Sequence, residues 1–385
     1  MTQADGAPTV GMIGGGQLAR MTAEAATALG VGFRVLAATP QDPAAQVVHD
    51  VRFGAHDDPA AVLEFAEGCD VITFDHEHVP TAILDALVAR GIAVRPGPRA
   101  LAHAQDKLHM RTALTAINVP CPPWSKAASP ADVAHFAQGH GWPVVLKTSR
   151  GGYDGRGVWV VHNVDEASAV MATPLAPDSS WLVEQFVPFT RELSAQVARS
   201  PHGQAVAYPV VQTTQINGIC AEVVAPAVEL SEELALQAQD IALRIARDLD
   251  VVGMLAVELF ETPDGLVVNE LAMRPHNSGH WTIDGAVTSQ FENHLRAVLD
   301  LPLGDPAGRA PFAVMVNILG GTVGGLYSAY RHVFARDPEL KVHLYGKEVR
   351  PGRKVGHVTV LGDDAESLLN RGRHAADYFS GVINE

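Results

Sequence analysis

The stretch AVELFETPDGLVVNELAMRPHNSGH, residues 256–280, decides the fold of this chain. Two short apolar runs flank a Pro-Asp-Gly turn at 263–265, which predicts a β-hairpin. Each strand carries one carboxylate among apolar neighbours, Glu258 on the first and Glu270 on the second. Carboxylates are rarely buried unless they are paired or bind a cation, so this pair, with Asn269 beside it, suits Mg²⁺ carrying nucleotide phosphates. A solvated hairpin whose acids face water is the alternative, and this stretch alone leaves both open.

A dense run of hydrogen-bond donors, Arg-Pro-His-Asn-Ser-Gly-His, follows the hairpin at 274–280. Such a run suits an anionic small molecule. If the carboxylates bind a metal, the hairpin and this run would place a metal-phosphate site next to a small-molecule site.

Composition limits the possible classes of protein. The chain has 385 residues, is 47% hydrophobic and 18% charged, and carries a formal net charge of −15, which predicts a soluble globular protein of two or three domains. The negative charge argues against a nucleic-acid partner. Three widely separated cysteines without a CxxC pair indicate a reducing cytoplasm, and no apolar run is long enough for a membrane span. The N-terminus does not resemble a secretory signal, so we expect a cytoplasmic protein.

Residues 9–100 alternate short apolar strands with helical stretches, which predicts a parallel α/β sheet with ligands at the carboxyl ends of its strands. The expected strands are TVGMIGGG, VGFRVLAA, DVITFD and GIAVRP, and the first helix should end at Gly30. One amphipathic helix is expected over 100–117, before a Pro-rich boundary. After a mixed region, a Pro/Gly-rich linker from about residue 301 introduces a smaller tail with the strands FAVMVNIL, KVHLYG and GHVTVLG.

The first glycine turn, GGGQLA at 14–19, formally fits a dinucleotide-binding pattern. A nicotinamide enzyme also needs an acid at the end of the second strand, where this chain has Ala37 and Ala38. Two interpretations of this segment therefore remain open. It is a structural turn, or it is a turn that brings Gln17 to another ligand. Asp75 and Glu77 end a later strand of the same sheet and could accept hydrogen bonds from a substrate there.

A second glycine-rich segment, LKTSRGGYDGRGVWVV at 146–161, gives a stronger signal. Lys147 ends an apolar strand, and four glycines follow before the next strand, so the loop could cover phosphates while the lysine neutralises their charge. The P-loop order, in which the lysine follows the glycines, is absent. The alternative is an ordinary hairpin with a mobile tip, but Tyr153, Asp154 and Arg156 in the tip favour closure over a reacting group.

Two further segments give weaker signals. EQFVPFTRE at 184–192 could be a hinge that contacts adenine, with Glu192 on the ribose, or a plain strand–turn–strand. YGKEVRPGRKVGHVTV at 345–360 gathers four basic residues in an acidic chain and could be a phosphate-ester site or a solvated edge. Neither an H-E-x-x-H zinc signature nor a G-x-S-x-G nucleophile elbow occurs, so zinc and covalent serine chemistry have no support.

The order of these parts resembles the ATP-grasp superfamily. Within it, GGGQLAR, GGYDGRG, EQFVPFTRE and NELAMRPHNSGHWTIDGAVTSQFENHLRAV resemble the N5-carboxyaminoimidazole ribonucleotide synthetase family of purine biosynthesis, from about residue 10 to residue 375. The resemblance implies an α/β and α+β fold with three parts. These are a Rossmann-like domain at 1–105, an ATP-grasp domain at 106–300 with a lid at about 122–190, and a small strand-rich domain at 301–385.

The resemblance also implies the activity: ATP and Mg²⁺ activate bicarbonate as carboxyphosphate, and the amino group of 5-aminoimidazole ribonucleotide is carboxylated, with release of ADP and phosphate. A homodimer is what the family suggests. One alternative is a related ATP-grasp ligase, such as formate-dependent glycinamide ribonucleotide transformylase. Two functions of a different class also stay open, namely a nicotinamide oxidoreductase and a non-catalytic nucleotide-binding regulator.

Residue roles carry over from the same resemblance. ATP contacts are implied for Lys107, Lys147, Gly152, Tyr153, Asp154, Gly155, Arg156, Gly157, Glu184, Gln185, Phe186, Val187, Glu192, Gln215, Asn269 and Glu270. Substrate contacts are implied for Gln17, Leu18, Asp75, Glu77, Tyr153, Arg156, Arg274, His276, Asn277, Ser278, Lys347, Arg353 and Lys354. Catalytic roles fall on Asp154, Arg274, His276 and Asn277, and metal binding on Glu258 and Glu270.

Three positions depart from the family pattern. Lys107 stands where an arginine is common, and it keeps the charge but loses the bidentate fork. Gln212 and Gln215 stand where an acid and a histidine are often found. These changes affect the details of adenosine contact.

Overall fold

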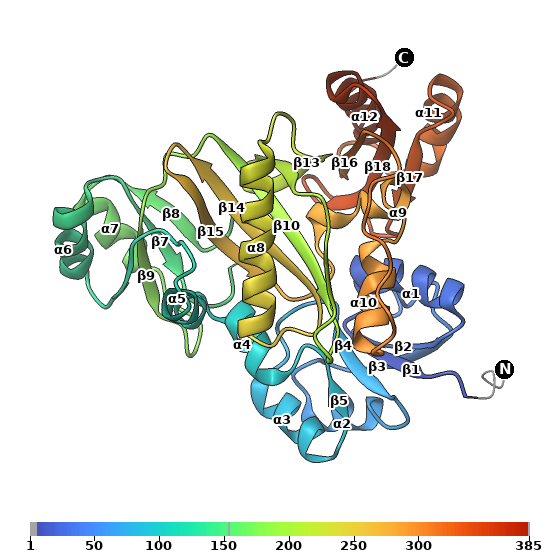
Figure 1. Cartoon of the computed structure of the whole chain (residues 1–385), viewed down its shortest axis with the longest axis horizontal. Helices are drawn as coiled ribbons and strands as arrows, with labels where there is room; N and C mark the ends of the chain where they lie inside the picture. The colour runs from blue at the N-terminus through green and yellow to red at the C-terminus, as the bar shows by residue number, and fades with distance from the viewer. Residues whose placement is uncertain (1–5, 153–154, 384–385) are drawn as a thin grey trace.

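The computed structural model describes residues 6–152 and 155–383, and it shows three sheets arranged around a common centre (Figure 1). The predicted site residues Tyr153 and Asp154 lie outside the described residues. In the described part of the chain, no helix combines the length and the apolar composition that crossing a membrane requires.

The N-terminal sheet is parallel, with the strand order β3-β2-β1-β4-β5. Its strands are β1 (Thr9–Ile13), β2 (Gly32–Ala37), β3 (Asp50–Phe53), β4 (Val71–Phe74) and β5 (Ala93–Val94), and its helices are α1 (Gln17–Leu29), α2 (Pro59–Phe65) and α3 (Thr81–Ala89). The expected parallel α/β fold is confirmed, and Gly30 ends α1 in a left-handed conformation as predicted. The sequence analysis missed β3 because this edge strand is half polar and only partly buried.

The single helix expected over 100–117 is wrong: the segment forms α4 (Pro98–Gln105) and α5 (Lys107–Ala116). Asp106 separates them with an extended backbone, and its carboxylate accepts hydrogen bonds from the N–H groups of Leu108 (2.9 Å) and His109 (3.2 Å). An aspartate that caps a new helix in this way is a common start signal. Lys107, the first residue of α5, contacts Glu270 of β15.

A small sheet with the order β6-β9-β7-β8 forms the arm on the left of Figure 1. It contains β6 (Trp124–Ala127), β7 (Val144–Thr148), β8 (Val158–Val161) and β9 (Trp181–Gln185), with α6 (Pro130–His140) and α7 (Val164–Met171) packed on it. The predicted hairpin on either side of the glycine-rich loop is β7 and β8.

The largest sheet has the order β15-β14-β10-β12-β13-β16-β18-β17, with β11 beside β10, and its pairs are antiparallel. Its strands are β10 (Arg191–Arg199), β11 (Ala205–Ala207), β12 (Val211–Ile216), β13 (Ile219–Ala225), β14 (Gly253–Thr262), β15 (Gly265–Ala272), β16 (Phe312–Leu319), β17 (Lys341–Leu344) and β18 (Lys354–Gly362). The three strands predicted for the tail therefore continue the central sheet through the β13–β16 pair.

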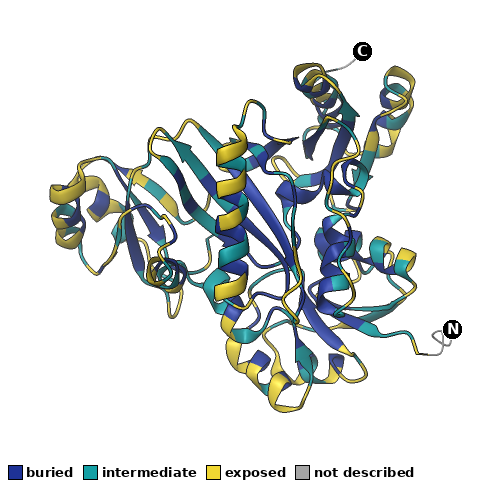
Figure 2. Cartoon of the chain, in the orientation of Figure 1, coloured by how far each residue is buried: buried dark blue, intermediate teal, exposed yellow. Residues whose placement is uncertain are grey.

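Helices cover this sheet and connect its parts. They are α8 (Glu232–Asp248), η1 (Asn277–Gly279), α9 (Thr282–Gly285), α10 (Gln290–Val298), η2 (Leu326–Ala329), α11 (Tyr330–Arg336) and α12 (Ala365–Ser380). Figure 2 shows that α8 is exposed along one side and buried along the other. Its buried residues include Ile241 and Ile245, one turn apart, as expected for an amphipathic helix lying on a sheet.

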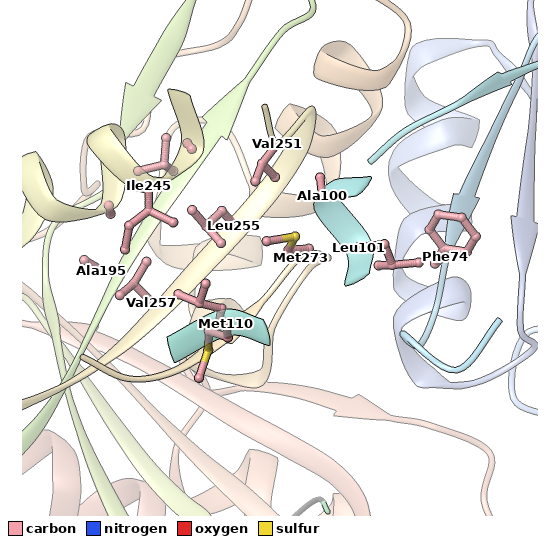
Figure 3. Packing of buried hydrophobic residues seen from close by; sticks show 14 of the residues in the cluster. Phe74, Ala100, Leu101, Met110, Ala195, Ile245, Val251, Leu255, Val257 and Met273 are labelled. Carbon is pink, nitrogen blue, oxygen red and sulfur yellow. The ribbon is translucent and has the colours of Figure 1, made fainter. Parts of the chain in front are cut away.

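The core of the N-terminal sheet is continuous with the core of the central sheet. Phe74 of β4, Leu101 of α4, Met273 after β15 and Leu255 of β14 belong to one buried cluster (Figure 3). Because close-packed interiors transmit displacement, this shared core fixes the two sheets relative to each other. The space between them is therefore a cleft with defined walls.

Candidate active site

One cleft of about 1550 Å³ brings the two predicted halves of the site together. Every described residue to which the sequence analysis assigns a role lines this cleft, except Gly157 and Ser278. The N-terminal sheet, the small sheet, the central hairpin and the 347–354 segment all contribute to its walls. The glycine-rich loop and the donor run therefore face the same space.

The two carboxylates of the opening hairpin lie opposite each other, with Glu258 of β14 paired in register with Glu270 of β15. The register shifts directly after Glu258, so a bulge lies at this point of the pair. Burial and the neighbouring Glu270 raise the pKa of Glu258 to about 7. Lys107 Nζ lies 2.5 Å from Glu270 Oε1. Burial alone would raise the pKa of Glu270, but Lys107 and the more distant Lys147 and Arg111 lower it.

A buried ion-pair network lies in the part of the cleft next to the glycine-rich loop. Lys147 Nζ lies 2.7 Å from Glu184 Oε2 and 3.2 Å from Asn269 Oδ1. Arg111 Nε donates to Glu184 Oε1 over 2.5 Å, and Arg111 Nη2 donates to the backbone oxygen of Asn269 over 2.7 Å. These contacts join α5, the small sheet and β15. The sequence analysis missed Arg111, because on an amphipathic helix it looks like a solvated residue, yet it is fully buried.

The charges in this network are strongly coupled. Burial opposes ionisation of Glu184, but Lys147 and Arg111 lower its pKa to about 2. Burial lowers the pKa of Lys147, and Glu184 partly offsets that shift. Glu184 therefore holds an ammonium at the floor of the cleft, where phosphate oxygens could displace the amide contact to Asn269.

The glycine-rich loop has little room for side chains. A Cβ at Gly152 would lie 2.7 Å from the backbone oxygen of Arg156, and Gly157, at a φ of +76°, would place one 2.6 Å from Thr148 Oγ1. Arg150 Nε donates to Asp106 Oδ2 over 2.9 Å, which ties the loop to the start of α5. The described ends of the loop are thus closely packed at Gly152 and Gly157, next to the end of β7.

The expected hinge lies between β9 and β10. Phe186 and Phe189 are partly exposed in the cleft, and Phe189 stacks on Phe260 with a centroid distance of 4.5 Å. Burial raises the pKa of Glu192, and a side-chain hydrogen bond from Gln215 partly opposes this shift. Gln215, one of the departures from the family pattern, is therefore a direct partner of the residue expected to hold ribose.

The donor run on the other side of the cleft is held largely by uncharged partners, and its contacts with acids are those of Arg274 with Glu77 and of His276 with Glu258. Arg274 Nε donates to Glu77 Oε2 over 2.8 Å. Asn277 and Asn317 exchange two amide hydrogen bonds, of 3.2 and 2.8 Å. His276 Nε2 lies 3.5 Å from Glu258 Oε1, so the donor run touches the carboxylate hairpin. Burial and Arg274 lower the pKa of His276 to about 3, which keeps the ring neutral.

Asp75 has a local structural partner as well as a place in the cleft. Its carboxylate accepts hydrogen bonds from the N–H groups of Gly16 (2.5 Å) and Ala19 (3.0 Å) at the start of α1. A Cβ at Gly16 would lie 2.2 Å from Asp75 Oδ2, so glycine is required for this approach. Burial raises the pKa of Asp75, although both backbone contacts oppose the shift. The glycine turn is thus fixed by Asp75.

The C-terminal basic segment reaches the N-terminal sheet. Lys347 Nζ donates to Gln17 Oε1 over 2.5 Å, and Gln46 Nε2 donates to the backbone oxygen of Gly346 over 2.9 Å. Arg353 and Lys354 line the same part of the cleft. These contacts bring together residues 300 or more positions apart in the sequence.

The donor set around Glu258 and Glu270 fits a hard divalent cation. Two facing carboxylates, one with a raised pKa, and the amide oxygen of Asn269 are ligands that Mg²⁺ prefers. Among the residues that the structure describes, no group of three or more His, Cys, Asp or Glu side chains is arranged to hold a metal. Phosphate oxygens would have to complete the coordination, as is usual for nucleotide-bound Mg²⁺.

Comparison with protein families assigns all three parts of the chain. Residues 7–105 match the ribonucleotide synthetase preATP-grasp domain, and residues 112–291 match the ATP-grasp domain. Residues 313–371 match the phosphoribosylaminoimidazole carboxylase C-terminal domain.

Known relatives are similar over nearly the whole chain. The N5-carboxyaminoimidazole ribonucleotide synthase of Mycobacterium tuberculosis is 55% identical over 378 residues, which is 97% of this chain and 88% of the relative. That of Corynebacterium ammoniagenes is 43% identical over 380 residues, or 97% of this chain and 92% of the relative.

Solved structures give the same result. The N5-carboxyaminoimidazole ribonucleotide synthetase of Thermus thermophilus superposes with a TM-score of 0.85 at 39% identity, covering 98% of this chain and 99% of that one. The enzyme from Aspergillus clavatus in complex with ADP and 5-aminoimidazole ribonucleotide has a TM-score of 0.88 at 31% identity, covering 97% and 99%.

Proposed function

Because this chain belongs to the N5-carboxyaminoimidazole ribonucleotide synthase family of ATP-grasp ligases, we propose that it carboxylates 5-aminoimidazole ribonucleotide with ATP and bicarbonate. The observation that carries the proposal is the single cleft in which Lys147 and the glycine-rich loop face the Arg274–Asn277 segment. One half suits nucleotide phosphates and the other suits an anionic acceptor. The product is N5-carboxyaminoimidazole ribonucleotide, an intermediate of purine biosynthesis.

The reaction has two steps. A bicarbonate oxygen attacks the γ-phosphorus of ATP, ADP leaves, and carboxyphosphate forms. The amino nitrogen of the ribonucleotide then bonds to the carboxyl carbon, while the bond from this carbon to the phosphate oxygen breaks with its electron pair on phosphate. The phosphate takes the proton that the amine loses. Because carboxyphosphate hydrolyses readily, the loop at 152–158 must exclude water between the steps.

The nucleotide side follows from the charged network. Lys147 and the glycine-rich loop with Arg156 hold the phosphates, the segment 184–187 holds adenine, and Glu192 with Gln215 holds ribose. Lys107, Asn269 and Glu270 lie at the phosphate end. Glu258 and Glu270 would hold Mg²⁺, which neutralises the charge that develops on the transferred phosphoryl group. The placement of Lys147 between Glu184 and Asn269 supports this assignment.

The acceptor side follows from the donor run. Arg274, His276 and Asn277 face carboxyphosphate and the aminoimidazole, together with Asp154, which lies outside the described residues. Gln17, Leu18 and Glu77 contact the ribonucleotide. Lys347, Arg353 and Lys354 take its 5′-phosphate, which the contact between Lys347 and Gln17 supports. Asp75 acts here through the turn that it holds, and Ser278 through His276.

The family resemblance also underlies three wider proposals. The domain boundaries lie near residues 105 and 300, with a lid at about 122–190. The protein forms a homodimer. It acts in the cytoplasm.

The test is the release of ADP by the purified protein with and without each substrate. The proposal predicts release that needs both bicarbonate and 5-aminoimidazole ribonucleotide, together with uptake of labelled bicarbonate carbon into the ribonucleotide. ATP cleavage that ignored both substrates would overturn it. Cleavage that needs formate and glycinamide ribonucleotide instead would indicate the related transformylase.

A further inference from the structure

His276 stands between the two halves of the cleft, and buried neutral groups hold its backbone and its Nδ1 atom. Gln290 binds its backbone twice: Gln290 Oε1 accepts from the N–H of His276 over 2.9 Å, and Gln290 Nε2 donates to its carbonyl oxygen over 2.8 Å. Gln290 is fully buried at the start of α10. The clamp sets the position of the imidazole, and Glu258 lies beside Nε2.

The other ring nitrogen faces Ser278. Ser278 Oγ lies 2.9 Å from His276 Nδ1, and the backbone N–H of Ser278 also points at Nδ1 over 3.4 Å. A backbone N–H can only donate, so Nδ1 must carry the lone pair. If Nδ1 carried a proton, two hydrogens would face each other, which burial would make costly.

Two more groups complete the arrangement at Ser278 Oγ. Ser194 Oγ lies 2.8 Å from it, and Gln196 Nε2 donates to it over 3.1 Å. Since two donors can supply this oxygen, its own proton is available for His276 Nδ1. Ser278 is only 1% exposed, and it does not line the cleft. The proton of the neutral ring then sits on Nε2, the nitrogen nearest Glu258.

We propose that Ser278 fixes His276 as the Nε2–H tautomer, so that His276 acts in the cleft as a fixed hydrogen-bond donor and not as a proton-transfer group. This inference rests on the proposed carboxylation. When the amine adds to the carboxyl carbon, negative charge grows on the carboxyl oxygens, and a donor already in place stabilises that charge. His276 is the catalytic residue of this pair, and Ser278 is a positioning residue.

The tautomer can be read directly. Nitrogen NMR of protein labelled with ¹⁵N-histidine, with the His276 signals assigned by their loss in His276→Gln, should show a protonated Nε2 and an unprotonated Nδ1. A ring protonated on Nδ1, or on both nitrogens, in the wild type would overturn the proposal. This measurement needs no variant to be active.

Three substitutions separate donation from proton transfer. The amide of a glutamine reaches the Nε2 position and can donate there, whereas the amide of an asparagine reaches only the Nδ1 position. We expect His276→Gln to keep kcat within about tenfold and His276→Asn and His276→Ala to lose about 10²–10³-fold, the range for one lost donor. A folded His276→Gln protein as inactive as His276→Ala would overturn the donor role.

Ser278→Ala tests the positioning role. It should lower kcat about tenfold, the loss expected for one supporting hydrogen bond, with an unchanged KM for ATP and a mixture of His276 tautomers in the NMR spectrum. Ser200→Ala is the matched control, because Ser200 is also buried but lies just beyond the far end of β10. Equal kcat values for the two variants, with an unchanged tautomer, would overturn the role of Ser278.

Failure of the inference differs from failure of the proposed function. A wild-type protein that released no ADP with bicarbonate and 5-aminoimidazole ribonucleotide would overturn the function itself. A wild type that carboxylates, but whose His276 carries its proton on Nδ1, would overturn only the inference.

Discussion

The two halves of the cleft are built from different chemistry. The nucleotide half rests on buried ion pairs, Arg111–Glu184 and Lys147–Glu184. The acceptor half rests largely on neutral hydrogen bonds, such as the Asn277–Asn317 pair and the Gln290 clamp on His276. Removing one member of a buried ion pair leaves an uncompensated charge, which costs far more than the loss of a neutral hydrogen bond.

The difference follows from what each half has to do. In the proposed reaction, the nucleotide half would meet a polyanion and its metal, and its lysines Lys107 and Lys147 lie next to the carboxylates Glu270 and Glu184. The acceptor half would hold the short-lived carboxylated species of the proposed reaction, and its His276 is kept neutral by burial and by Arg274, which lower its pKa to about 3. We therefore expect substitutions in the two halves to fail in different ways.

The largest effect should come from the metal end of the nucleotide half. Glu270→Gln removes a carboxylate that faces Glu258 and is paired with Lys107, and it should lower carboxylation by about 10³-fold, because the metal-phosphate end loses a fixed charge. The measurement is ADP release with both substrates present. Glu261→Gln is the control, since Glu261 lies on the same hairpin but pairs with Arg191. Activity retained in Glu270→Gln would remove Glu270 from the site.

The second effect is on stability. Arg111→Met leaves the buried carboxylate of Glu184 paired only with Lys147 and the backbone oxygen of Asn269 without its donor. Breaking a buried pair in this way costs about 3–5 kcal/mol, so the free energy of unfolding in urea should fall by that amount.

Arg247→Met is the comparison for Arg111→Met. Arg247 pairs with Asp248 at the exposed end of α8, and its loss should cost less than about 1 kcal/mol. If the free energy of unfolding fell by less than about 1 kcal/mol in both variants, the buried charged network would not be what stabilises the nucleotide half.

In the acceptor half, Gly279→Ala should disturb the clamp on His276. A Cβ at Gly279 would lie 2.4 Å from Gln290 Oε1 and 2.6 Å from Gln196 Nε2. Overpacking of this kind costs about 1–3 kcal/mol, and kcat should fall while the KM for ATP stays the same. A raised KM for ATP with an unchanged kcat would show that the two halves are not separable in this way.

The last effect is a pH dependence of stability that arises from Glu258, and it leaves the chemistry of the cleft unchanged in kind. Its pKa rises from 4.5 to about 7 on folding, so the folded state binds the extra proton. The stabilisation from this group is complete below its ordinary pKa and is lost as the pH rises through about 7. The stability of the wild type relative to Glu258→Gln should therefore fall between pH 5 and pH 8. A constant difference would contradict the raised pKa, and Mg²⁺ with ATP should reduce the pH dependence by pairing with the carboxylate.

Local patterns in the sequence were enough to predict much of the fold. The apolar runs around the Pro-Asp-Gly turn predicted β14 and β15, and alternation of strand and helix predicted the parallel N-terminal sheet. The break at Asp106 could have been found too, because aspartate is a frequent helix cap, but the amphipathic period runs through it. These elements depend on residues close together in the sequence, so the sequence alone contains the information needed to predict them.

Features that depend on distant partners could not be read from the sequence. Arg111 belongs to the site because it binds Glu184, 73 positions away, and the backbone oxygen of Asn269. Neither partner is close to it in the sequence. The continuation of the central sheet into the tail depends on the pairing of β13 with β16. Ser278 stands in the donor run, but the structure places it against Ser194 and Gln196 and not in the wall of the cleft.

One measurement tests most directly whether the two halves work on one intermediate. The protein is incubated with ATP, 5-aminoimidazole ribonucleotide and bicarbonate labelled with ¹⁸O, and the released phosphate is analysed by mass. Attack of a bicarbonate oxygen on the γ-phosphorus, followed by transfer of the carboxyl group, predicts one bicarbonate oxygen in each phosphate and a carboxylated ribonucleotide in equal amount. Phosphate that contains only oxygen from ATP and water would contradict the account.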